Sequence, residues 1–223
     1  MTSDIFKTTL PVMFGYIPLG IAFGVLFQEL GYPWYLATLM AVFVYAGAAQ
    51  FLIVGLLAAG AGLFEIVVSI FLVNSRHMFY GLSLLKDYGA WGFRKLYLIF
   101  GLTDETYSLL TTISTPDGLK RQQHYLTITF FNHTYWVLGC TLGALIGSTF
   151  EFNSQGLEFT LTALFVVLVM EQWKKIKQVK PFLIALLAAI IAMLISSDHM
   201  LLLSIFLSVV LLIGQNIKGI RDE

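Results

Sequence analysis

Hydrophobic residues form long runs along this chain, and polar residues gather in the short stretches between them. A helix rises about 1.5 Å per residue, so about twenty apolar residues cross the roughly 30 Å of hydrocarbon in a bilayer. The pattern predicts eight apolar segments, of which the last two are short and favour a tight hairpin. These segments are Leu10–Phe27, Trp34–Ala59, Leu63–Leu85, Leu96–Ile113, Tyr125–Phe150, Leu157–Trp173, Phe182–Ser196 and His199–Ile213. We expect an all-α, polytopic membrane helix bundle with seven to eight membrane segments, forming a single transmembrane domain over residues 1–223.

Composition supports this class and excludes several others. The chain is 58% hydrophobic and 12% charged, whereas a soluble domain carries about twice that share of charged residues. Its 13 basic and 13 acidic residues cancel, so the basic surface that binds nucleic acid is missing. A single cysteine, Cys140, excludes internal disulfides and multi-cysteine metal sites. The chain has no zinc-protease, serine-hydrolase or phosphate-loop motif. We therefore expect neither an enzyme nor a bound cofactor or metal.

The positions of the basic residues predict how the chain is oriented in the membrane, because loops rich in Lys and Arg stay in the cytoplasm. The connection Glu171–Pro181 contains four lysines, and the tail adds Lys218 and Arg221, so we expect a cytoplasmic C-terminus. If all eight segments cross, the N-terminus is inside and the basic loop Lys86–Lys95 lies on the wrong side. If the polar fourth segment does not cross, the N-terminus is outside and only Lys7 is misplaced. We favour the second arrangement.

Two features suggest a transporter architecture. Leu19-Gly20-x3-Gly24 recurs as Leu138-Gly139-x3-Gly143 about halfway along the chain. In the seven-span arrangement the two halves would form an inverted repeat, as in many transporters. Small residues at this spacing also occur wherever membrane helices pack closely. Pro11 and Pro18 each remove a backbone donor. They predict a broken first helix, with free N–H groups near Pro18 that would suit an anion.

Three segments carry polar clusters near their midpoints: Asn74-Ser75-Arg76-His77, Thr103-Asp104-Glu105 and Asn132-His133. A charge inside the bilayer costs at least about 2.5–3.5 kcal/mol, so these residues must be paired or face water. One interpretation is structural, with Arg76 pairing with Asp104 or Glu105 to hold two helices together. The other is that the three clusters line a central cavity.

The cavity interpretation assigns a role to each side chain. Arg76 would hold a carboxylate through its two-pronged donors. Asp104 or Glu105 would hold an ammonium group or carry a proton, and the two histidines would relay protons near neutral pH. Gln50 in the second segment also needs a partner, either in packing or in the cavity. The predicted substrate-binding residues are Pro18, Gly20, Gly47, Gln50, Asn74, Arg76 and Asn132. The predicted proton-coupling residues are His77, Asp104, Glu105 and His133.

Four motifs resemble those of the AzlC family. They are Pro18-Leu19-Gly20-x3-Gly24, Gly47-Ala48-Ala49-Gln50-Phe51, Asn74-Ser75-Arg76-His77-x-x-Tyr80-Gly81 and Thr103-Asp104-Glu105-x-Tyr107. They lie in the first half of the chain, and the last third matches the family only in hydrophobicity.

This resemblance implies the large subunit of a branched-chain amino-acid exporter in the bacterial inner membrane. It also implies a small AzlD-like membrane subunit as partner and transport driven by the proton gradient. The expected substrates are valine, leucine and isoleucine, with methionine as a further candidate.

Two alternatives to a secondary transporter remain open from the residues alone. A channel-like pathway for another small solute would use the same polar centre without saturable, gradient-coupled exchange. A non-transport scaffold subunit would use its ionisable residues only to lock helices together. Three clusters at one depth exceed what a single helix-locking pair requires, which favours transport.

Overall fold

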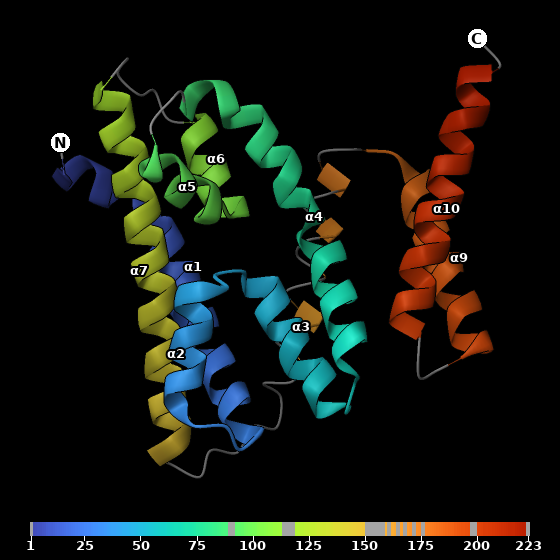
Figure 1. Cartoon of the computed structure of the whole chain (residues 1–223), viewed down its shortest axis with the longest axis horizontal. Coiled ribbons are helices and arrows are strands. Elements are labelled where there is room, and N and C mark those ends of the chain that lie inside the picture. Colours follow the sequence, from blue (N-terminus) through green and yellow to red (C-terminus); the bar gives the residue numbers. More distant parts are fainter. Residues whose placement is uncertain are drawn as a thin grey trace. The chain divides into compact units, whose positions relative to one another are not determined.

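The computed structural model describes residues 2–88, 92–112, 119–149, 159, 162–163, 166, 169–170, 173–174, 177–196 and 200–221. Within these residues the regular structure is helical and contains no strand (Figure 1), which confirms the all-α prediction. The helices are α1 (Thr2–Glu29), α2 (Trp34–Phe43), α3 (Gly47–Ala58), α4 (Leu63–Tyr88), α5 (Phe93–Phe100), α6 (Asp104–Thr112), α7 (Leu119–Thr149), α9 (Val179–Ile195) and α10 (Met200–Arg221). Most of the predicted segment Leu157–Trp173 lies outside the described residues.

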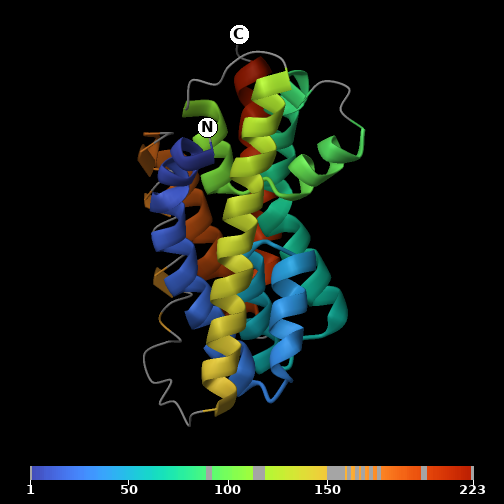
Figure 2. The ribbon, with the colours of Figure 1, turned by 90° about the vertical axis from the view of Figure 1, so that its left-hand side faces the viewer.

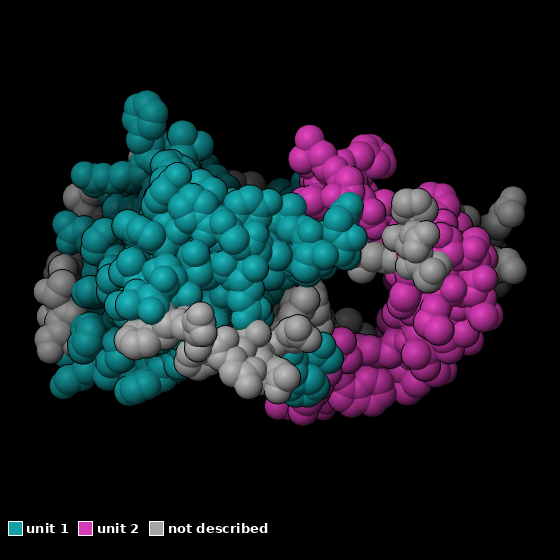
Figure 3. Space-filling model, turned by 90° about the horizontal axis from the view of Figure 1, so that it is seen from below, with its two compact units in different colours: residues 1–60, 73–163 teal, residues 61–72, 164–223 magenta. Residues whose placement is uncertain are grey.

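The chain divides into two compact units, coloured separately in Figure 3. Unit 1 comprises residues 1–60 and 73–163, and unit 2 comprises residues 61–72 and 164–223. Among the described residues, only Asp4–Glu29 of α1 is long and apolar enough to cross a membrane by length and composition. The number of membrane segments and the single domain over residues 1–223 therefore stay predictions.

The first helix is continuous, so the predicted break at its prolines is wrong. α1 runs from Thr2 to Glu29 with Pro11 and Pro18 inside it. Each proline removes one backbone hydrogen bond, but the neighbouring turns keep theirs. Membrane helices tolerate proline for this reason.

α1 packs closely along α7, and glycines make this approach possible (Figure 2). A Cβ added at Gly20 would lie 2.8 Å from the backbone nitrogen of Cys140, and one at Gly139 would lie 2.9 Å from the carbonyl oxygen of Ile17. At Gly24 and Gly143 an added Cβ would clash with the backbones of Cys140 and Ile21. We call these four glycines the glycine seam. The two repeated motifs therefore pack against each other.

The seam also shows that α1 and α7 run in the same direction. Thr9 contacts Tyr135, Gly20 faces Gly139, and Gly24 faces Gly143, so the residue numbers rise together along both helices. An inverted repeat would make the two motif-bearing helices antiparallel. The predicted inversion is therefore wrong for this pair.

The predicted single segment Trp34–Ala59 is two helices that form a hairpin. α2 runs opposite to α7, since the hydroxyls of Thr38 and Thr141 lie 2.9 Å apart while Tyr45 stacks on His133. α3 then returns, and Leu57 near its end lines the same apolar groove as Leu36 of α2. At the tip of this hairpin, Tyr45 and Ala46 are buried, whereas Val44 is exposed.

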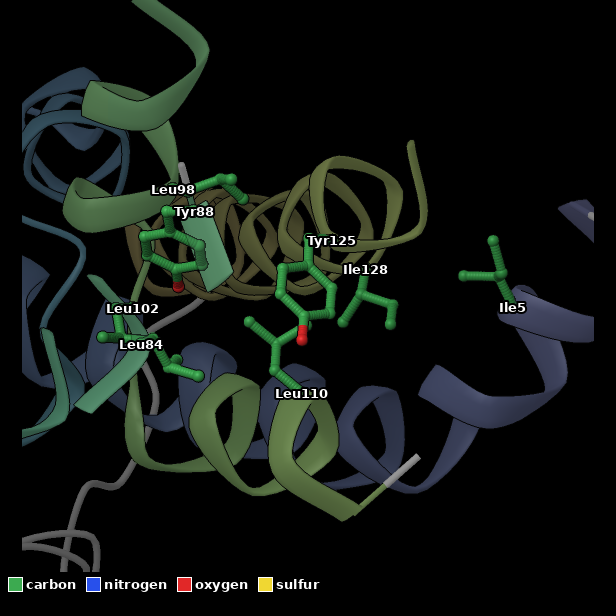
Figure 4. Packing of buried hydrophobic residues seen from close by; sticks show 8 residues of the cluster. All are labelled: Ile5, Leu84, Tyr88, Leu98, Leu102, Leu110, Tyr125 and Ile128. Carbon is green, nitrogen blue, oxygen red and sulfur yellow. The ribbon is translucent and has the colours of Figure 1, made fainter. Parts of the chain in front are cut away.

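The predicted fourth segment, Leu96–Ile113, is also interrupted. α5 ends at Phe100 and α6 begins at Asp104. Helices of eight or nine residues are roughly 12–14 Å long, so neither half crosses a bilayer by itself. Leu98 and Leu102 anchor this interruption in a buried hydrophobic cluster (Figure 4). The cluster comprises Ile5, Leu84, Tyr88, Leu98, Leu102, Leu110, Tyr125 and Ile128.

In unit 2, α9 and α10 pack against each other as the sequence predicted for its last two segments. The short connection between them makes the pair antiparallel. α9 buries Ile184, Ala188 and Ala192, which lie on one helix face because they are four residues apart. Small alanine side chains let the two helices approach closely.

Candidate functional site

The two helix interruptions of unit 1 meet against the middles of α1 and α7. The Tyr45 ring at the hairpin tip lies 6.2 Å from the ring of Phe100, the last residue of α5. Both rings also contact His133, at 4.3 Å and 5.8 Å between centroids. We call the polar side chains gathered at this meeting point the polar centre. They are Tyr16, Tyr45, Gln50, Thr103, Glu105, Thr106, Asn132, His133 and Trp136.

A hydrogen-bond network links α1 to the start of α6. The hydroxyl of Tyr16 lies 2.7 Å from Thr103 Oγ1 and 2.7 Å from Glu105 Oε2. A hydroxyl has one proton, and the carboxylate can only accept a hydrogen bond, so Tyr16 donates to Glu105. Tyr16 is buried, whereas Glu105 is exposed within the described chain. Glu105 therefore joins the buried network to accessible space.

The same network continues onto α7. Thr103 Oγ1 lies 3.0 Å from Thr106 Oγ1, which accepts a 3.0 Å hydrogen bond from Asn132 Nδ2. Asn132 is fully buried, and its Oδ1 has no hydrogen-bond partner among the described residues. A buried acceptor of this kind is a candidate contact for a bound polar group.

Gln50 connects the first turn of α3 to α7. Its Oε1 accepts hydrogen bonds from Trp136 Nε1 at 2.8 Å and from the backbone nitrogen of Ala46 at 3.3 Å. Its Nε2 is buried without a partner within the described part of the chain. The polar centre therefore holds both an unused donor and an unused acceptor.

Aromatic side chains enclose these polar groups. The Trp136 ring lies 5.4 Å from Tyr16 and 6.5 Å from Phe23, and Phe23 lies 5.8 Å from Phe51. The Tyr97 hydroxyl lies 3.3 Å from His133 Nδ1. The polar groups are therefore surrounded by aromatic rings from α1, α3, α5 and α7.

The structure brings together five of the residues predicted from sequence. Glu105, Asn132 and Gln50 belong to the polar centre, and His133 stacks on its Tyr45. Gly47 is close by, because a Cβ there would lie 3.1 Å from the Trp136 ring. Asp104 begins α6 beside Glu105.

Other predicted residues lie elsewhere. Pro18 is exposed on α1, and Gly20 belongs to the glycine seam, where helix packing accounts for it. Asn74 and His77 lie on α4, where the His77 ring is 5.9 Å from that of Tyr80. The side chain of Arg76 is outside the described part of the structure. Its pairing with Asp104 or Glu105 therefore stays a prediction.

Several residues of the polar centre were not predicted as site residues: Tyr16, Tyr45, Thr103, Thr106 and Trp136. Thr103 is the first residue of a recognised motif, and Tyr45 lies two residues before Gly47 of another, so these motifs are the signal that could have identified them. Tyr16 and Trp136 lie in apolar runs and carry no charge, so nothing in the pattern singled them out. Within the described residues, no three His, Cys, Asp or Glu side chains could hold a metal ion.

Comparisons with known proteins show which family this sequence resembles. The sequence model of the AzlC protein family matches residues 11–150, which include the whole polar centre. The branched-chain amino acid transport protein AzlC of Bacillus subtilis is 37% identical over 78% of this chain and 68% of its own length.

Two further relatives are named as membrane proteins. An uncharacterized membrane protein of Helicobacter pylori is 37% identical over 94% of this chain and 92% of its own length. The inner membrane protein YgaZ of Escherichia coli is 28% identical over 76% of this chain and 72% of its own length. No solved structure matches the chain.

Proposed function

The chain belongs to the AzlC family of membrane proteins, and from this membership we propose that it exports branched-chain amino acids across the bacterial inner membrane. The substrates are valine, leucine and isoleucine, with methionine as a further candidate. A relative named as a branched-chain amino acid transport protein supports the substrate class. The cytoplasmic C-terminus, inferred from the lysine-rich connection, belongs to the same proposal.

The observation that carries this proposal is the pair of unused hydrogen-bonding atoms in the polar centre. An amino acid is a zwitterion, so its carboxylate needs donors and its ammonium group needs acceptors. Gln50 Nε2 is an unused donor, Asn132 Oδ1 is an unused acceptor, and Glu105 is an accessible carboxylate. The surrounding aromatic rings supply an apolar environment for a branched side chain.

Proton coupling is the second part of the proposal. Ionisable side chains at membrane depth commonly mark proton relays in transporters. Glu105 is the leading candidate because it contacts Tyr16 inside the polar centre. His133 contacts the same centre. Asp104 and His77 are the remaining candidates.

The partner is a small AzlD-like membrane subunit. Several helices of the described chain present large exposed apolar side chains, including Phe14 on α1, Phe64 on α4 and Leu194 on α9. Such surfaces suit lipid or another membrane subunit. The partner's identity rests on family membership.

The test is efflux of preloaded labelled valine and leucine from cells that lack their own exporters. The chain is expressed alone, with an AzlD-like partner, and with an uncoupler added. We expect efflux that needs the partner and collapses with the uncoupler. Labelled lysine serves as the substrate control, because its charged side chain does not fit an aromatic-lined site.

Each alternative gives a different result. Efflux that neither saturates nor responds to the uncoupler would indicate a channel-like pathway. No efflux from a well-expressed, correctly inserted pair would overturn the substrate assignment and favour a scaffold.

A further inference from the structure

The N-terminus of α3 gathers buried hydrogen-bond donors that have no acceptor. The first N–H groups of a helix have no partner within the helix, and the helix dipole gives this end a partial positive charge. No side chain caps α3 at Ala46. Instead, the Gln50 side chain folds back so that its Oε1 accepts the N–H of Ala46.

The orientation of the Gln50 amide follows from its neighbours. Trp136 Nε1 and the Ala46 nitrogen can only donate hydrogen bonds, so the atom between them must be the oxygen. Nε2 is bonded to the same carbon as Oε1 and therefore also lies at the start of α3. It is a donor on a fully buried side chain, and it has no partner in the described chain.

Tyr45 supplies a second donor at the same helix end. Its side chain is 3% exposed. Its hydroxyl interacts with Tyr16 and Thr106, but neither contact has the geometry of a full hydrogen bond within the described part of the chain. Its backbone φ is 43°, a left-handed conformation that is strained for a residue other than glycine. Stacking on His133 holds the ring in place.

We propose that the start of α3, with Gln50 Nε2 and the Tyr45 hydroxyl, binds the carboxylate of the transported amino acid. This assignment rests on the proposed export function and specifies which atoms recognise the substrate. Uncharged hydrogen-bond donors and a helix N-terminus recognise the carboxylate, and together they can bind an anion without a cationic side chain. The oxygens of Asn132 and Glu105, in the same network, receive the ammonium group.

The sharpest test changes only the unused atom. Gln50→Glu keeps the oxygen that accepts from Trp136 and Ala46, and replaces the Nε2 donor with a second oxygen. Affinity is measured on the purified protein, with its partner if efflux requires one, using L-valine and L-valinamide, which lacks the carboxylate. Tyr45→Phe is the second variant, because it removes a donor without introducing a titratable group.

The matched control is Gln28→Glu, on α1. Gln28 also has a buried side-chain oxygen without a partner, but it packs against Gly147 rather than against the start of α3. This control shows what a new carboxylate does elsewhere in unit 1.

We expect Gln50→Glu to weaken valine binding about tenfold to a hundredfold and Tyr45→Phe to weaken it several-fold. Valinamide binding should change little in either variant, and Gln28→Glu should bind valine normally. Wild-type valine affinity in both site variants would overturn the carboxylate assignment, and so would equal losses for valine and valinamide. Wild-type protein that neither binds nor exports valine would overturn the proposed function as well.

Discussion

The glycine seam and the polar centre use the same two helices for opposite purposes. At the seam, α1 and α7 approach so closely that an added Cβ at Gly24 or Gly143 would collide with the opposite backbone. At the polar centre, the same helices present Tyr16, Asn132 and Trp136 to the interrupted helices.

The difference between these regions shows how rigid packing positions a polar site. Backbone-to-backbone contact fixes the height of α7 relative to α1, since neither helix can slide without a clash. The polar side chains one or two turns away are then held at matching heights. We therefore expect changes in the seam to affect folding and changes in the polar centre to affect transport.

The largest effect should come from Gly143→Ala. The new methyl group would meet the backbone of Ile21, which cannot move aside as a flexible side chain would. Overpacking commonly costs about 1–3 kcal/mol, and we expect the upper end of this range or beyond. The readouts are the thermal midpoint and the yield of monodisperse protein in detergent.

Gly15→Ala is the control for the seam. Gly15 is on α1, and an added Cβ there meets nothing within 4 Å. Its thermal midpoint should stay near that of the wild type. Equal destabilisation by both substitutions would mean that the seam is not a tight contact.

The next effect should come from Glu105→Gln, which keeps the size of the side chain and removes its ability to carry a proton. We expect valine efflux to lose its dependence on the pH gradient and to resemble efflux with the uncoupler. Asp104→Asn is the comparison, because Asp104 is the adjacent carboxylate. If efflux in Glu105→Gln still follows the gradient and efflux in Asp104→Asn does not, the coupling role belongs to Asp104.

A smaller effect should come from Tyr16→Phe, which removes the hydroxyl between Thr103 and Glu105. A lost buried hydrogen bond costs about 1–2 kcal/mol, so the thermal midpoint should fall modestly. Efflux should also slow, because Glu105 loses the donor that positions it. Tyr35→Phe, at an exposed position, should change neither quantity. Unchanged efflux in Tyr16→Phe would remove this tyrosine from the site.

The smallest effect should come from Thr38→Val. The hydroxyls of Thr38 and Thr141 bond to each other on α2 and α7, away from the polar centre. We expect a loss of about 0.5–1 kcal/mol and normal efflux. Thr141 Oγ1 also donates to the Val137 carbonyl, but the two threonines share one bond, so the double change Thr38→Val with Thr141→Val should cost less than the sum of the two single changes. Fully additive losses would mean that the bond contributes nothing.

Part of the polar centre was predictable because polar and ionisable side chains are rare inside apolar membrane segments. Glu105, Asn132 and His133 stand out as costly groups inside apolar runs, and the structure brings all three to one place. Tyr16 and Trp136 are equally close to the centre, but aromatic residues are common in apolar helices. Only their contacts across the fold distinguish them.

The membrane class and the helical fold could both be predicted from the sequence. These depend on local hydrophobicity, which needs no knowledge of contacts. Only the tertiary structure decided where helices break. Pro18 was expected to break a helix but lies in a continuous one, whereas Tyr45 drew no such expectation but lies in the break between α2 and α3. A proline removes only one backbone hydrogen bond, and the helix continues through the neighbouring turns. The turn at Tyr45 instead depends on the contact between the Tyr45 ring and His133 of α7. That stabilising contact exists only in the tertiary structure, where α2 packs along α7.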